Sequence, residues 1–143
     1  MALSAPLRKD RGMAHPQMFD DDPILEQVRS IALALPGAQE KISHGRPAFF
    51  TTKVHCYYGG AVKTDGQWHA HDQAVVLHLP AVETAALQQD PRCFIPAYLG
   101  LSGWIGVDLD ERTDAQELAE LIEESYRTVA PKRLLAALDG AAR

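Results

Sequence analysis

Three runs of aromatic and β-branched residues constrain the fold of this chain more than any other feature of its sequence. The runs span residues 47–52, 53–58 and 73–79, and turn residues such as Gly59-Gly60 lie between the last two. Two further short runs follow at 93–98 and 104–108. Strands joined by short loops pair antiparallel, because parallel pairing needs a long crossover. The sequence therefore predicts antiparallel strands in these regions.

Three helices are expected around the strands. The first spans 22–35, where an Asp N-cap precedes Pro23 and an apolar stripe recurs at helical spacing. A short second helix spans 80–90. The third spans 113–138, opens with a capping box, and breaks or kinks at Pro131.

This order of elements predicts the fold class. Helix, three strands, helix, two strands and helix give an α+β two-layer sandwich, α-β(3)-α-β(2)-α, with a five-stranded antiparallel sheet and its helices on one face. A length of 143 residues suits one such domain. We expect residues 1–19, which lack periodicity, to form a flexible N-terminal tail, and residues 20–143 to form the single domain.

The sequence gives little reason to expect an enzyme, a metal or a cofactor. His69 and His71 alternate as two ligands on a strand would, but no set of four well-spaced ligands accompanies them. His55 and Cys56 are neighbours on a predicted strand, so we expect their side chains to point to opposite faces. No nucleophile elbow, phosphate-binding loop or dinucleotide fingerprint occurs. A non-enzymatic protein without metal or cofactor is the expectation.

Cysteine usage and hydropathy bear on localisation. The chain has two cysteines, in no metal-binding spacing, whereas small secreted domains are usually cross-linked more densely. No apolar segment follows the basic residues near the N-terminus, and no apolar run approaches the ~20 residues of a membrane helix. We therefore expect a cytoplasmic protein without membrane association.

Charge is unevenly distributed along the chain, although its net value is −5. Residues 41–63 hold no acidic residue and four cationic ones, which are Lys41, Arg46, Lys53 and Lys63. Residues 108–124, in contrast, are strongly acidic. The first strands could thus offer cations to the phosphates of DNA, with nearby aromatic rings stacking on bases. The alternative is a solvated surface whose charges serve solubility.

Several patterned segments resemble the MmcQ/YjbR family. They are LPGA at 35–38, SHGRPAF at 43–49, KV at 53–54, GWI at 103–105, SY at 125–126 and APK at 130–132. The resemblance runs from about residue 22 to 138. It implies a compact α+β fold similar to secretion-chaperone and frataxin-like proteins, with five antiparallel strands. It also implies DNA binding through paired hairpins described as a double wing, and it carries no catalytic residues. If DNA is the partner, the four cations are the expected phosphate contacts.

Two other functions remain open at this point. A protein-interaction domain, either chaperone-like or homodimerising, would need an exposed apolar patch, for which Phe49, Phe50, Tyr57 and Tyr58 are candidates. A small-ligand site or undiscovered enzyme would need a pocket that gathers His44, Arg46 and Trp104.

Overall fold

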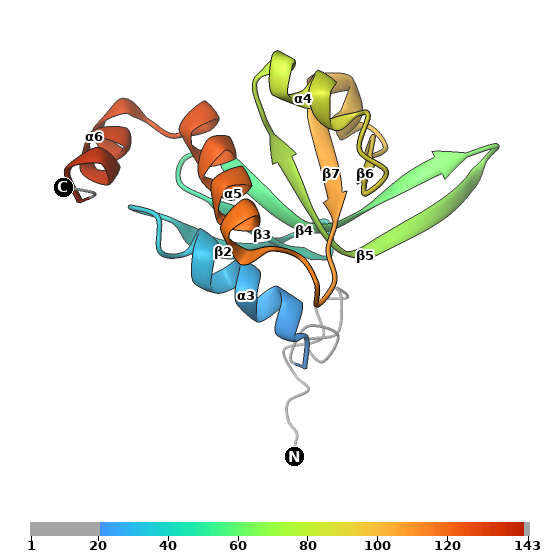
Figure 1. Cartoon of the computed structure of the whole chain (residues 1–143), viewed down its shortest axis with the longest axis horizontal. Helices are drawn as coiled ribbons and strands as arrows, with labels where there is room; N and C mark the ends of the chain where they lie inside the picture. The colour runs from blue at the N-terminus through green and yellow to red at the C-terminus, as the bar shows by residue number, and fades with distance from the viewer. Residues whose placement is uncertain (1–20, 142–143) are drawn as a thin grey trace.

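The computed structural model describes residues 21–141, and the tail expected at 1–19 lies outside these residues. The fold is α+β, as predicted, and within the described residues its antiparallel sheet has six strands in the order β2-β3-β4-β5-β7-β6 (Figure 1). The elements in chain order are α3 (Pro23–Ala32), β2 (Gln39–Ser43), β3 (Arg46–Phe50), β4 (Val54–Thr64), β5 (Gln67–His78), α4 (Ala81–Leu87), β6 (Cys93–Phe94), the 3-10 helix η1 (Leu99–Ser102), β7 (Trp104–Asp108), α5 (Ala115–Val129) and α6 (Lys132–Ala141). The prediction of five strands in the order α-β(3)-α-β(2)-α is therefore wrong by one strand.

The extra strand is β2, whose sequence lacks the apolar pattern that predicts a strand. Its residues, QEKIS, are mostly polar, because β2 lies at the edge of the sheet. His44-Gly45 joins β2 to β3, with φ of 53° and 80° respectively. Both positive φ angles suit the two-residue turn that connects tightly paired strands.

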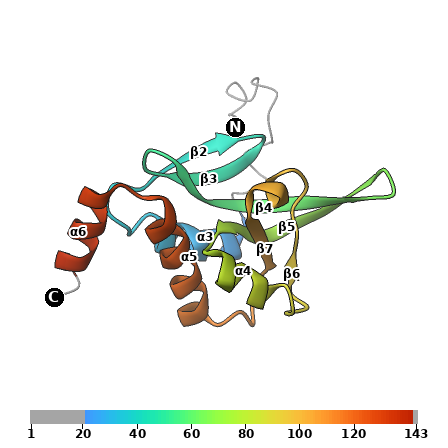
Figure 2. The same ribbon diagram turned by 90° about the horizontal axis from the view of Figure 1, so that it is seen from above.

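β4 and β5 form a hairpin much longer than predicted. Gly59-Gly60 was expected to end the strand, but it forms an irregularity inside β4, and pairing resumes at Gly60. The chain reverses instead at Asp65-Gly66, where φ is 53° and 77°. The tip of this hairpin and helix α6 lie at opposite ends of the molecule (Figures 1 and 2).

Helices α3 and α5 pack on one face of the sheet, as predicted, with α5 against β4 and β5. Asp22 caps α3 by accepting hydrogen bonds from the amides of Ile24 and Leu25. The core between the layers joins buried residues of both helices, such as Val28 and Tyr126, to alternate residues of the strands. The predicted last helix is two helices, because Pro131 separates α5 from α6.

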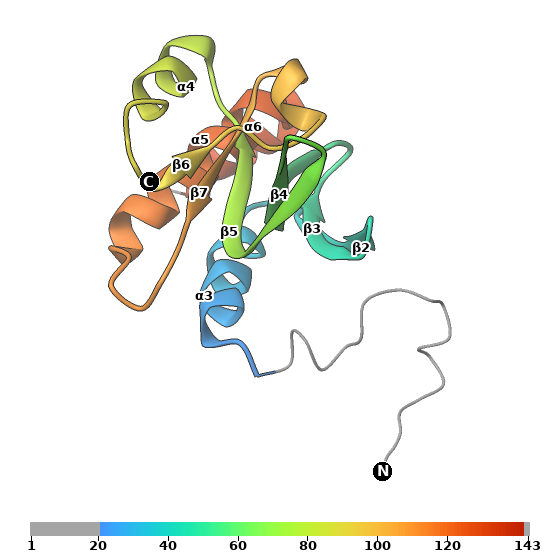
Figure 3. The same cartoon turned by 90° about the vertical axis from the view of Figure 1, so that its right-hand side faces the viewer.

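The segment after β6 leaves the sheet early. A strand was expected over 93–98, but β6 ends at Phe94, and Pro96 lacks the amide proton that strand pairing requires. The amide of Ala97 instead donates to the carbonyl of Ala61 on β4, at 2.8 Å. The segment of residues 95–99 therefore lies beside the β4–β5 hairpin (Figure 3).

No helix within residues 21–141 combines the length and apolar character needed to cross a bilayer.

Candidate functional site

The sheet has one face that α3 and α5 leave uncovered, and we call it the open face. Strand residues alternate between faces, so paired residues of neighbouring strands form rows. Phe49, Cys56, Leu77 and Ile105 form a row in the core beneath the helices. The adjacent row, which points to the open face, is Ala48, Tyr57, Val76 and Gly106.

Aromatic side chains occupy much of the open face. The ring of Trp104 packs against Tyr57 and His78, with centroid separations of 5.3 and 5.1 Å. Phe94 lies so close over Gly106 that a Cβ there would meet its ring at 2.2 Å. His71 stacks on the same phenyl ring at 3.8 Å and contacts Asp108 through its Nδ1, at 2.8 Å. The absence of a side chain at Gly106 therefore makes room for the Phe94 ring on the sheet.

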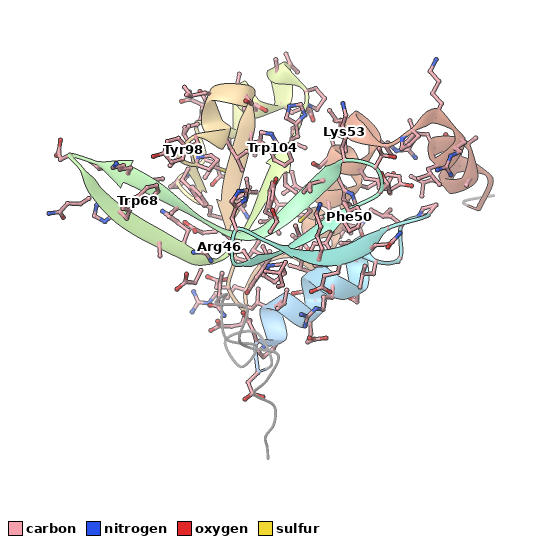
Figure 4. The ribbon with its side chains drawn as sticks, turned by 180° about the vertical axis from the view of Figure 1, so that it is seen from behind. Arg46, Phe50, Lys53, Trp68, Tyr98 and Trp104 are labelled. Carbon is pink, nitrogen blue, oxygen red and sulfur yellow. The ribbon has the colours of Figure 1, made fainter. Side chains whose placement is uncertain are left out.

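A hollow of about 430 Å³ opens beside these rings, and we call it the aromatic pocket. Its floor is the sheet at Gly59, Gly60 and Ala61, where side chains are absent or small. Its lining includes Ser43, His44, Arg46, Tyr57, Trp68, Val76 and residues 96–99. Figure 4 shows Trp68 and Tyr98, which line it from different segments of the chain. The pocket exists because 95–99 crosses to β4 while the strand beneath it lacks bulky side chains.

Tyr98 lines this pocket from a rare backbone conformation. Its φ and ψ are 65° and −56°, and the amide of Leu99 donates to the carbonyl of Ala97 at 2.7 Å. These features define a γ-turn of the rare, strained form. Tyr98 is 70% exposed, and the centroid of its ring lies 5.9 Å from that of Trp68. The strained turn thus presents an aromatic ring to the pocket.

The four cations predicted from the sequence do not form one compact cluster. The Lys41 ammonium lies 4.6 Å from the Phe50 ring centroid, and that of Lys63 lies 5.3 Å from the Trp68 ring. Lys53 precedes β4 and Lys63 is near its end, so the two are separated by about 30 Å at ~3.3 Å per residue. Within residues 21–141, none of these three lysines forms an ion pair.

Arg46 differs from the lysines because it has a carboxylate neighbour. Its Nη2 donates to Asp72 Oδ1 at 3.3 Å. The guanidinium crosses β4 above Gly59, where a Cβ would meet Nη1 at 2.3 Å. One carboxylate oxygen engages only part of the five-donor guanidinium. Arg46 therefore reaches the aromatic pocket with donors to spare.

The two residues predicted as a ligand or loop site are only partly brought together. His44 lines the aromatic pocket, and its Nδ1 lies 3.3 Å from Ser43 Oγ. Trp104 lies outside the lining but packs on Tyr57, which lines it. Sequence patterns do not identify Tyr98 as a site residue, because it lies in the segment 93–98 that they predict to be a strand. Its positive φ belongs to a turn that the strand pattern of residues 93–98 does not predict.

The buried ionisable groups are poorly suited to acid–base or nucleophilic chemistry. Burial lowers the pKa of His55 to about 4, and neither ring nitrogen has a hydrogen-bond partner within the described residues. Burial, with Asp90 nearby, raises the pKa of the Cys93 thiol to about 11, and burial raises that of Cys56 further.

His55 and Cys56 both reach the core under α5, contrary to the expectation of opposite faces. Phe50 pairs with Val54 and Phe49 with Cys56, so His55 is an extra residue in the ladder.

The acidic residues of α5 lie on the helix layer. Glu117, Glu120, Glu123 and Glu124 belong to α5, whose buried side faces the core. Glu117 binds Arg92 through two contacts of 3.0 Å, and Glu123 binds Arg127 at 2.9 Å. No group of three His, Cys, Asp or Glu side chains in the described part of the chain could hold a metal ion.

Comparisons with known proteins agree with the fold. The family model described as YjbR matches residues 33–128. The crystal structure of Deinococcus radiodurans protein DR2400, with the family-model domain DUF419, is similar with a TM-score of 0.54 and 19% identity, over 76% of this chain and 79% of that one. No curated protein matches the sequence. The family resemblance expected from the sequence motifs is thus confirmed: the chain belongs to the YjbR family.

Proposed function

We propose that this protein is a non-enzymatic module that binds DNA through the open face of its sheet. One observation carries the proposal: lysines without ion pairs and exposed aromatic rings share this face, whereas the acidic residues of α5 lie on the helix layer. Lysines neutralise phosphates, and aromatic rings stack on bases. A chain of net charge −5 can bind a polyanion if its charges are separated in this way.

Lys41, Arg46 and Lys63 are the proposed central phosphate contacts, and Lys53 would contact a phosphate near the far end of β4. Lys41 and Lys63 are already held against Phe50 and Trp68, so less side-chain freedom is lost on binding. Arg46 would exchange part of its contact with Asp72 for a phosphate or base. A modest affinity that depends on salt follows from so few contacts.

Fluorescence anisotropy with labelled DNA at several salt concentrations tests the proposal. For four phosphate contacts, log K should fall against log salt with a slope of roughly −3 to −4. Lys41→Glu/Lys63→Glu should reduce the slope by about 1.5. The matched control Lys132→Glu/Arg133→Glu on α6 changes the net charge equally and should leave the slope within experimental error. No binding to the unmodified protein at low salt, or equal losses in both variants, would refute the proposal.

The chemistry of the buried groups supports a binding role over catalysis. A thiol with a pKa of about 11 remains protonated at neutral pH and is a weak nucleophile. A histidine with a pKa near 4 is a poor general base at neutral pH.

A protein partner is the second candidate, and exposed apolar side chains favour it. Ile95, Tyr98 and Leu101 are 48%, 70% and 94% exposed, and Trp68 is 53% exposed. Such a patch can mark an interaction site or a homodimer interface. Sedimentation equilibrium tests for the homodimer. If a dimer forms through this patch, the Leu101→Ser/Tyr98→Ser variant should be monomeric. A strictly monomeric unmodified protein would exclude the homodimer.

A further inference from the structure

We propose that the aromatic pocket receives an unpaired base, so that the preferred ligand is single-stranded nucleic acid. This inference rests on the proposed function but goes beyond phosphate contacts. It assigns a separate site, formed by Tyr57, Trp68, Tyr98 and Arg46 over the glycines of β4.

The shape and lining of the pocket suit a planar, mostly apolar ligand. Its volume of about 430 Å³ lies in the range of roughly 300–1,000 Å³ that is typical of small-ligand sites. The rings of Tyr57, Trp68 and Tyr98 line it, and Gly59 and Gly60 add no side chain to its floor. Aromatic side chains that stack on bases contribute affinity with little sequence preference.

Polar groups at the pocket match the rest of a nucleotide. Arg46 can donate to a base edge or a phosphate while it keeps its contact with Asp72. His44 lies beside it on the β2–β3 turn. The Lys63 ammonium lies over Trp68, so a phosphate attached to a base stacked on that indole would meet a cation. A neutral aromatic ligand would not use these charges.

A recessed pocket favours unpaired bases over paired ones. A base in a duplex is stacked on both sides and hydrogen-bonded at its edge, so it must leave the helix before it can enter a pocket. A base in a single strand leaves its stack at a much smaller cost. The strained γ-turn at Tyr98 is consistent with this site, because stored strain clusters at ligand sites.

Tryptophan fluorescence provides the test, since the chain has two tryptophans and only Trp68 lines the pocket. In a Trp104→Phe protein, emission from Trp68 would be titrated with three ligands at low salt. They are a ten-residue oligothymidylate, an abasic strand of the same length and charge, and a duplex of the same length. We expect oligothymidylate to quench Trp68 and to bind roughly 5- to 150-fold more tightly than the abasic strand, the effect of one stacked base.

Variants measured by anisotropy of the labelled strand separate the pocket from the phosphate contacts. Trp68→Ala should lose roughly tenfold or more in affinity for oligothymidylate and little for the abasic strand. Trp68→Phe should recover most of the loss, because a ring remains. Leu101→Ala is the matched control: it is an exposed apolar residue of the neighbouring segment that does not line the pocket. Circular dichroism would verify that each variant is folded.

The outcomes distinguish this inference from the proposed function. Equal affinity for oligothymidylate and the abasic strand, with strong salt dependence, would overturn the base pocket and leave phosphate binding intact. Tighter binding of the duplex than of oligothymidylate would also overturn the base pocket and leave phosphate binding intact. No binding of any of the three ligands would refute both proposals.

Discussion

The buried imidazole of His55 should make the stability of this protein fall as the pH drops from 7 to 5. The side chain is 0% exposed, its ring lies edge-on 5.2 Å from that of Tyr126, and burial lowers its pKa from 6.5 to about 4. The unfolded chain therefore binds a proton at higher pH than the folded chain does. Stability is fully present above pH 6.5, decreases as the pH falls toward 4, and changes no further below 4.

The magnitude follows from the two pKa values. With pKa values of 6.5 unfolded and about 4 folded, the linkage relation gives a loss of about 2 kcal/mol between pH 7 and pH 5. Urea unfolding followed by circular dichroism at both pH values would measure it. His55→Leu, which replaces the imidazole with an apolar group of similar size, should lose about 2 kcal/mol less than the unmodified protein over this interval.

An exposed histidine provides the control. His69 lies on the outer part of β5 and is exposed, so His69→Leu removes an imidazole outside the core. The Asp90 carboxyl, whose pKa is lowered to about 2 by its contacts with Arg92, changes stability with pH only below about pH 4, which lies outside this interval. If His55→Leu and the unmodified protein lose equal stability between pH 7 and 5, the argument from the buried imidazole is wrong.

Two further predictions concern packing and capping. Gly106→Ala would place a Cβ 2.2 Å from the Phe94 ring and should lower the stability by about 1–3 kcal/mol or more. Gly140→Ala, in open space on α6, should raise the stability by about 0.5–1 kcal/mol. Urea midpoints would compare the two variants, and an equal effect of both would contradict the packing of Phe94 on Gly106. Asp22→Ala removes the cap of α3 and the acceptor of the Tyr58 hydroxyl, so thermal unfolding should show a loss of about 2 kcal/mol. Asp22→Asn, which keeps a cap acceptor, should lose less, and equal losses would exclude capping as the cause.

The elements with strong local signals were predicted from the sequence. Asp22 and Pro23 mark the beginning of α3, and the apolar stripe identifies its buried side. The final helix begins one residue later than its predicted capping box, because Asp114 rather than Thr113 is the N-cap. The Thr113 hydroxyl accepts from the amide of Asp110 instead. Both residues are good caps, so the local sequence does not distinguish them.

The open face could not be predicted in the same way. The edge strand β2 has no apolar alternation, because it contributes little to the core. The outer half of the β4–β5 hairpin is exposed on both sides, so its residues show no strand periodicity. The pocket depends on the contact of Ala97 with Ala61, between residues that are distant in sequence. The cationic segment 41–63 and the turn before β3 indicate Arg46 and His44 as candidates, whereas their position beside Trp68 and Tyr98 is a property of the folded chain.

Chemical-shift mapping with an oligothymidylate strand tests the central claim, that the open face binds nucleic acid, most directly. In ¹⁵N-labelled protein at low salt, we predict that the amide signals of 43–46, 57–61 and 97–99 shift, together with the indole signal of Trp68. The signals of the outward side of α5 should not move. Shifts that are confined to the helices, or a spectrum that the oligonucleotide leaves unchanged, would contradict the account.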